Sequence, residues 1–167
     1  MRPMTCLGLA MAGLLLTGCS KPAAPPEKPK TYAMTPDGNA QYLADNAKKP
    51  GVTTLPNGME YRVLTAGTGK QATGPHDLVT VSYKGWTVNG RVFTGTPAGQ
   101  TVTFSIGRLI TPGWNDALFM MHEGDEWEVA LPPELGFGEA GLADAQLPPN
   151  SVITFQIKLV AVQPKPK

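Results

Sequence analysis

Two glycine-containing segments have residue types and spacings that bind phosphate groups in other proteins. Residues 136–141 fit the pattern G-x-G-x-x-G of dinucleotide-binding proteins. That site needs a helix directly after its glycines, whereas Pro148 and Pro149 follow here and favour a glycine-rich loop. Residues 65–70 resemble a P-loop, but the first glycine is missing and Gln71 replaces the Ser or Thr that would bind magnesium. The sequence therefore predicts a loop and a turn, and no cofactor.

The histidine, serine and cysteine residues do not indicate a metal site or a catalytic nucleophile either. His76 and His122 have no His, Glu or Asp at a metal-ligand spacing, and Glu123 would point away from His122 on a helix. No G-x-S-x-G or comparable serine setting occurs. Cys6 and Cys19, both near the N-terminus, are the only cysteines. We expect no metal site and no covalent catalysis.

The size and charge of the chain exclude some functions. Its 167 residues are enough for one small domain with appendages. A formal net charge of +1 with no long basic run gives no electrostatic surface for nucleic acid. We therefore expect no nucleic-acid partner.

The N-terminus resembles a bacterial lipoprotein signal. Arg2 precedes an apolar run over residues 7–16, which is too short to span a bilayer. The run ends in Leu-Thr-Gly-Cys, which resembles the lipobox, where Cys19 would be acylated and become the first mature residue. Ser20 after the cysteine favours sorting to the outer membrane, with the folded part in the periplasm. The alternative is an ordinary signal peptide that happens to contain a cysteine.

The composition then predicts a tether and a domain. Residues 20–30 are proline-rich and indicate an extended spacer, with an SH3-type ligand as the alternative. Residues 39–48 could form one or two helical turns. We divide the chain into a signal peptide (1–18), a lipidated cysteine with tether and lead-in (19–50), a domain (51–163) and a tail (164–167).

Alternating apolar residues predict antiparallel strands in the domain. The alternation covers residues 59–63, 79–84, 101–106, 126–131 and 153–159, and Asn89-Gly90 indicates a hairpin whose return strand starts at Val92. Between these strands, one helical face is formed by Trp114, Ala117, Leu118 and Met121. Thr111 suits the N-cap, Pro112 the first helical position and Gly124 the C-terminal stop. The expected fold is α+β, with a short helix across the concave face of a bent sheet.

Aromatic residues cluster at the predicted strand ends, at Tyr83, Phe93, Phe104, Trp114, Phe137 and Phe155. Each alone is typical of a core residue. Together with "VTVSYKGWTVNGRVF", "ITPGWNDAL", "MMHEGDEWEVALPPELGFGEAG" and "LPPNSVITFQIKLV", they resemble the FKBP-type peptidyl-prolyl cis-trans isomerases. The similarity is greatest to bacterial envelope members such as the macrophage infectivity potentiator group. It runs from Gly51 to Val162.

The resemblance implies a five- to six-stranded half-barrel around one short helix, with an apolar pocket between them. It implies catalytic roles for Tyr83, Phe93, Trp114 and Phe155, with Trp114 as the floor. It implies substrate contacts for Thr94, Val102, Phe104, Ile110, Thr111 and Phe137. The substrates would be proline-containing polypeptides, and the shorter lead-in favours a monomer over the dimers of some relatives.

The chain departs from the family at two pocket positions. Thr94 replaces an aspartate whose arginine partner is also absent between residues 95 and 107, although Thr94 can still hydrogen-bond Tyr83. Phe137 replaces a tyrosine, which removes a hydrogen bond worth about 1 kcal/mol. We expect an active isomerase that binds macrocyclic inhibitors of the family less tightly. The alternatives are a peptide-binding chaperone without catalysis and a structural lipoprotein that docks a partner.

Overall fold

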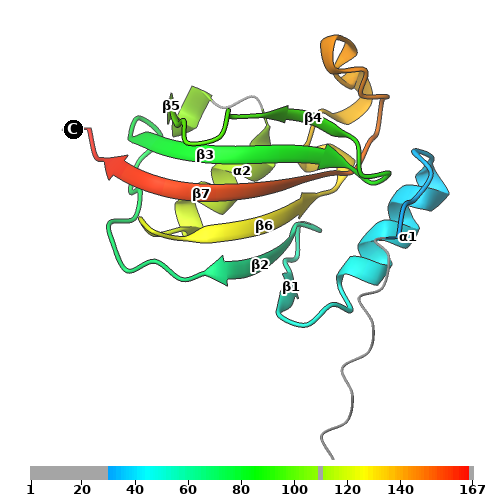
Figure 1. The fold of residues 1–167 in the computed structure, drawn as a ribbon, viewed down its shortest axis with the longest axis horizontal. Helices are drawn as coiled ribbons and strands as arrows, with labels where there is room; N and C mark the ends of the chain where they lie inside the picture. Colours follow the sequence, from blue (N-terminus) through cyan, green and yellow to red (C-terminus); the bar gives the residue numbers. More distant parts are fainter. Residues whose placement is uncertain (1–29, 109–110, 166–167) are drawn as a thin grey trace, which may run out of the picture.

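The computed structural model describes residues 30–108 and 111–165, which form one antiparallel sheet and two α-helices (Figure 1). The seven strands are β1 (Val52–Thr54), β2 (Glu60–Thr65), β3 (Leu78–Thr87), β4 (Val92–Gly95), β5 (Val102–Ser105), β6 (Glu126–Leu131) and β7 (Ile153–Gln163). Their order is β1-β2-β6-β7-β3-β4, and β5 also pairs with β3. The predicted α+β fold is confirmed, with seven strands rather than five or six. The additional strand, β1, is too short for an alternating pattern.

The two longest strands, β3 and β7, lie side by side in the middle of the sheet. They pair antiparallel from Leu78 opposite Gln163 to Thr87 opposite Ile153, with a register shift at Thr80 and Val81. Such irregularities bend a strand and increase its twist, which helps the sheet to curve. The predicted hairpin is confirmed, because the turn after β3 contains Gly90 with a φ of +83°.

Helix α2 (Pro112–Met120) lies behind the central strands in the view of Figure 1 and buries its apolar face against them. Trp114, Ala117, Leu118 and Met121 are all buried, as the spacing predicted. Around α2 the strands contribute Val79, Val81, Val129, Ile157 and Leu159 to the main core.

The start of α2 agrees with the prediction, because Thr111 is the N-cap residue and Pro112 the first helical residue, whereas its end differs. The side chain of Thr111 makes no capping hydrogen bond. The helix ends at Met120, because Met121 is extended with φ −78° and ψ 150°. Gly124, predicted as the stop, lies in the following turn with a φ of +94°.

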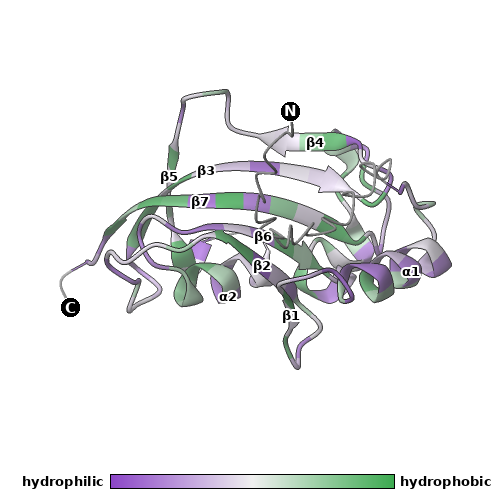
Figure 2. Ribbon diagram, turned by 60° about the horizontal axis from the view of Figure 1, so that its bottom comes forward, coloured by the Kyte–Doolittle hydropathy of each residue, from purple (hydrophilic) through white to green (hydrophobic). Residues whose placement is uncertain are grey.

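Helix α1 (Pro36–Asn46) is longer than the one or two turns predicted for residues 39–48. Thr35 Oγ1 caps it by accepting from the Gly38 N–H at 3.2 Å. The helix docks through apolar and polar contacts together. The Tyr42 ring packs in a small cluster with Val88, Ala130 and Val152, while Tyr42 Oη lies 2.8 Å from Thr154 Oγ1 and Asn46 donates to Glu60 at 2.7 Å. Glu60 is buried although its side chain is a carboxyl group, and Asn46 supplies it with a hydrogen-bond donor. In Figure 2, α1 mixes hydrophilic and hydrophobic residues, which explains why an apolar stripe did not reveal its length.

Several predicted features lie outside the described residues, namely the signal peptide, Cys19, the tether up to residue 29, and Ile110. Among the helices that are described, neither has the length and apolar character needed to cross a membrane.

Candidate functional site

An apolar cavity of about 290 Å³ lies between the start of α2 and the concave face of the sheet. Its lining residues are Tyr83, Phe93, Thr94, Phe104, Arg108, Thr111, Trp114, Phe137, Leu142 and Phe155. This volume is near the lower limit of pockets that hold small ligands. The cavity thus suits a compact apolar group rather than a large cofactor.

Trp114 is at the centre of the aromatic cluster, and the first turn of α2 positions it. Its ring meets Tyr83 of β3 edge-on, with centroids 4.9 Å apart and an interplanar angle of 89°. It meets Phe155 of β7 in the same way, at 5.2 Å and 88°. Trp114 is only 5% exposed and Phe155 only 3%. Edge-to-face contacts of this kind are a favoured geometry for aromatic pairs and hold the rings in place.

The outer wall of the cavity is formed by Phe93 of β4 and Phe137 of the loop after β6. Phe93 packs against Phe155 with centroids 5.7 Å apart, and against Phe137 at 6.4 Å. Both outer rings are half-buried, whereas Phe155 is fully buried. A chain of rings therefore leads from the mouth of the cavity to Trp114.

Polar groups in the cavity are few and weakly paired. Thr94 Oγ1 and Tyr83 Oη are 3.5 Å apart, at the outer limit of a hydrogen bond, so this contact is weak. Trp114 Nε1 is buried with no hydrogen-bond partner among the described residues. Within the described lining, Arg108 alone carries a formal charge. The cavity therefore recognises shape more than charge.

The structure brings together eight of the ten predicted site residues. Val102 is not a lining residue, because it pairs with Val81 and packs against the core. Ile110 lies outside the described residues. Two lining residues, Arg108 and Leu142, were not predicted, because they belong to segments without an aromatic or a periodic pattern.

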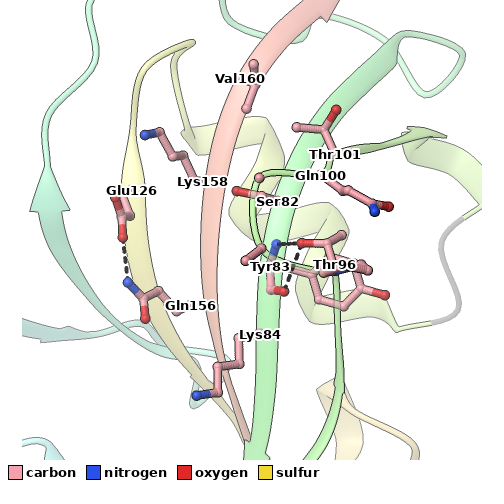
Figure 3. Close-up of a pocket in the computed structure, with 13 residues that line it drawn as sticks. Ser82, Tyr83, Lys84, Thr96, Gln100, Thr101, Glu126, Gln156, Lys158 and Val160 are labelled. Carbon is pink, nitrogen blue, oxygen red and sulfur yellow. Dashed lines mark hydrogen bonds between the residues drawn. The ribbon is translucent and has the colours of Figure 1, made fainter.

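A larger hollow of about 450 Å³ lies on the opposite, outer face of the sheet (Figure 3). Lys84, Gln156 and Lys158 line it, and the loop over residues 96–101 forms its side. Thr96 Oγ1 joins this loop to β3 by accepting from Tyr83 N–H at 3.1 Å. The hollow is more open than the aromatic cavity and its lining is more polar, so the smaller aromatic cavity is the better candidate for a site that must exclude water. In the part of the chain that is described, no three His, Cys, Asp or Glu side chains gather as a metal site.

Comparison with protein families identifies two matches along the chain. Residues 69–160 match the family model described as "FKBP-type peptidyl-prolyl cis-trans isomerase". Residues 25–63 match the model described as "Domain amino terminal to FKBP-type peptidyl-prolyl isomerase". The second match includes β1, most of β2 and helix α1.

Individual proteins agree with these matches. The peptidyl-prolyl cis-trans isomerase Mip of Coxiella burnetii is 42% identical over 125 residues, covering 74% of this chain and 53% of that protein. The outer membrane protein MIP of Legionella longbeachae is 39% identical, covering 73% and 52%. The crystal structure of FkpA from Escherichia coli has a TM-score of 0.71 at 34% identity, covering 78% and 60%. The chain spans about half the length of the two Mip proteins.

Proposed function

The chain belongs to the FKBP-type peptidyl-prolyl cis-trans isomerases, and we propose that it accelerates rotation about Xaa-Pro bonds in the aromatic cavity. The observation that carries this proposal is the set of rings around Trp114, which lines an apolar cavity of about 290 Å³ that is large enough for a proline ring. The substrates are proline-containing polypeptides.

The chemistry needs no nucleophile, metal or cofactor. Rotation about an amide bond has a barrier of about 18 to 20 kcal/mol, because the planar amide loses resonance as it twists. The twisted amide is less dipolar than the planar one, so a dry aromatic cavity destabilises the ground state more than the transition state. Each 1.36 kcal/mol of that difference gives about a tenfold rate increase.

Each aromatic side chain has a role in this proposal. Trp114 lies under the proline ring, while Phe155, Phe93 and Tyr83 form walls around it. Phe137 covers the mouth, and the backbone N–H of Thr111 lies at the rim, where it can donate to a substrate carbonyl. The two buried rings, Trp114 and Phe155, support this arrangement because their packing fixes the shape of the cavity.

An isomerase assay on the purified chain tests the proposal. A proline-containing peptide should reach cis–trans equilibrium faster with the chain than in buffer. Phe155→Ala should lose most of that acceleration, whereas Lys158→Ala in the outer hollow should keep it. A folded chain without activity would contradict the proposal.

One observation favours a second function, a chaperone that binds peptides without isomerising them. Tyr83 Oη and Thr94 Oγ1 are 3.5 Å apart, so the Tyr83 hydroxyl is only weakly hydrogen-bonded, and Phe137 has no hydroxyl. The double substitution Thr94→Asp with Phe137→Tyr separates the two functions. A large gain in turnover favours the chaperone, and a change of less than about threefold favours the isomerase.

The cellular location is also a proposal. We propose that Cys19 is acylated and anchors the chain in the bacterial envelope, with the folded part in the periplasm. The lipobox-like Leu-Thr-Gly-Cys sequence supports this, and so does the name "Outer membrane protein MIP" of the Legionella relative. Mass spectrometry of the mature N-terminus should find three acyl chains on Cys19. A free N-terminal cysteine, or cleavage elsewhere, would contradict it.

A further inference from the structure

The loop over residues 137–150 covers the cavity with Phe137 and Leu142. Most of its residues are exposed or half-buried, and Leu147 alone among them is buried. Within the loop, Leu142 and Leu147 exchange two backbone hydrogen bonds of 3.0 and 2.9 Å. A loop with so few buried contacts opens easily unless groups outside it hold it in place.

Arg91, directly before β4, holds the tip of this loop. Its Nη1 donates to the Ala145 carbonyl at 3.0 Å, and its Nη2 donates to the Gln146 carbonyl at 2.8 Å. These carbonyls lie at the end of a short 3₁₀ turn, where backbone acceptors lack partners within the turn. The rigid guanidinium fork satisfies both of them with charge-assisted hydrogen bonds.

The hairpin between β3 and β4 fixes the backbone of Arg91. The Arg91 N–H donates to Asn89 Oδ1 at 3.2 Å, and its carbonyl accepts from Thr87 N–H at 3.0 Å. Phe93 lies two residues further along in β4, where the register between β3 and β4 shifts from Thr94 opposite Gly85 to Val92 opposite Trp86. The short segment from Arg91 to Phe93 therefore supplies both the contact that holds the loop and the wall ring that meets Phe137.

Asn39 of helix α1 holds the other end of the loop. Asn39 is 8% exposed, and its Nδ2 donates to the Asn150 carbonyl at 2.7 Å. The Asn150 N–H in turn donates to the Gly138 carbonyl at 2.7 Å, next to Phe137. Helix α1 is thus connected to the covering ring by two successive hydrogen bonds.

We propose that Arg91 and Asn39 are positioning residues that keep Phe137 and Leu142 over the cavity. The catalytic consequence rests on the proposed isomerase function, whereas the effect on peptide binding does not. A loop that must be ordered when the peptide binds lowers affinity, because ordering costs conformational entropy. Losing either contact should therefore raise Kd and KM and leave kcat nearly unchanged.

The test compares Arg91→Met, Arg91→Lys and Asn39→Ala with two controls in the full chain. The controls are Arg62→Lys, whose side chain pairs with Glu128 at 3.1 Å on the sheet away from the cavity, and Gln41→Ala, which is exposed on α1. Calorimetric titration with a proline-containing peptide gives Kd, the isomerase assay gives kcat and KM, and amide exchange reports loop opening.

We expect Arg91→Met and Asn39→Ala to raise Kd about fivefold, since each loses charged or buried hydrogen bonds. The Kd of Arg91→Lys should lie between those of the two variants and the wild type, because lysine keeps the positive charge but cannot donate two hydrogen bonds in the geometry of the guanidinium group. Exchange should accelerate at Leu142 and Leu147 and stay unchanged at Val81 in β3. Both controls should match the wild type.

Two results in the variants would overturn the proposal, and one result in the wild type would do so as well. One is an unchanged Kd in folded Arg91→Met and Asn39→Ala. The other is amide exchange in these variants that accelerates as much at Val81 as at Leu142, which would mean that Arg91 and Asn39 stabilise the whole fold rather than the loop. A wild-type chain that binds peptide without isomerising it would contradict the isomerase function alone, and a raised Kd in the variants would still support positioning. A wild-type chain that binds no peptide would contradict both.

Discussion

Gly85 of β3 is the register partner of Phe155 of β7, and a Cβ placed on Gly85 would lie 2.6 Å from Cε1 of the Phe155 ring. The same Cβ would lie 2.8 Å from Cγ2 of Thr94. The ring of Phe155 occupies the space that a side chain on β3 would need. The absence of a side chain at position 85 therefore sets how Phe155 stands in the cavity wall.

We predict that Gly85→Ala displaces Phe155 and reduces both activity and stability. Overpacking of this kind costs about 1 to 3 kcal/mol, which urea unfolding would measure. In the isomerase assay, kcat/KM should fall by about tenfold or more. Gly74→Ala is the matched control, because its nearest contact for a Cβ is Asp77 Oδ1 at 3.8 Å. Wild-type activity in Gly85→Ala would show that the position of Phe155 does not matter.

A second prediction concerns the missing hydroxyl at position 137. Phe137→Tyr should increase the affinity for a macrocyclic inhibitor of the family about fivefold, since one neutral hydrogen bond contributes about 1 kcal/mol. Titration of both proteins with the inhibitor measures the change. Phe137→Leu should bind less tightly than the wild type, because it loses the ring that packs against Phe93. Equal affinities for all three would indicate that residue 137 does not face the ligand.

Asp77 makes stability depend on pH. Backbone N–H groups of Lys165 and Thr73 donate to its carboxylate at 2.9 and 2.8 Å and lower the pKa of Asp77 below its ordinary value of 3.8. Because the folded pKa is depressed, the stabilisation is present above pH 3.8 and is lost as the pH falls through the folded pKa.

We therefore predict that Asp77→Asn unfolds in less urea than the wild type at pH 7, and that the difference shrinks below pH 3.8. Urea unfolding at several pH values measures this. Asp144→Asn, in an exposed loop position, should follow the wild type throughout. A difference between Asp77→Asn and the wild type that stays constant into acid would rule out this role for Asp77.

The sequence was sufficient to predict the elements whose buried residues recur at a regular spacing. It was insufficient for the elements that are held in place by polar contacts. The alternation from Val79 to Tyr83 and the spacing from Trp114 to Met121 predicted β3 and α2, because apolar residues there all face the core. Helix α1 docks through Tyr42 and Asn46, whose bonds to Thr154 and Glu60 join segments far apart in the sequence. No periodic pattern reports such pairs.

The same distinction applies to the site. The aromatic residues around Trp114 could be named in advance because their types and order resemble a family. Leu142 and Arg108 could not, since one lies in a loop rich in small residues and the other precedes the helix without a motif. The support that Arg91 gives to the loop also depends on tertiary structure, because its acceptors are backbone carbonyls of Ala145 and Gln146.

The most direct test of the account is magnetisation-exchange NMR of a proline-containing peptide, which measures cis–trans interconversion without a coupled protease. Catalytic amounts of the chain should raise the exchange rate, Lys158→Ala should raise it equally, and folded Trp114→Leu should reduce the catalysed part at least about tenfold. A chain that leaves the exchange rate at its buffer value, or a folded Trp114→Leu that catalyses as well as the wild type, would contradict isomerisation in the aromatic cavity.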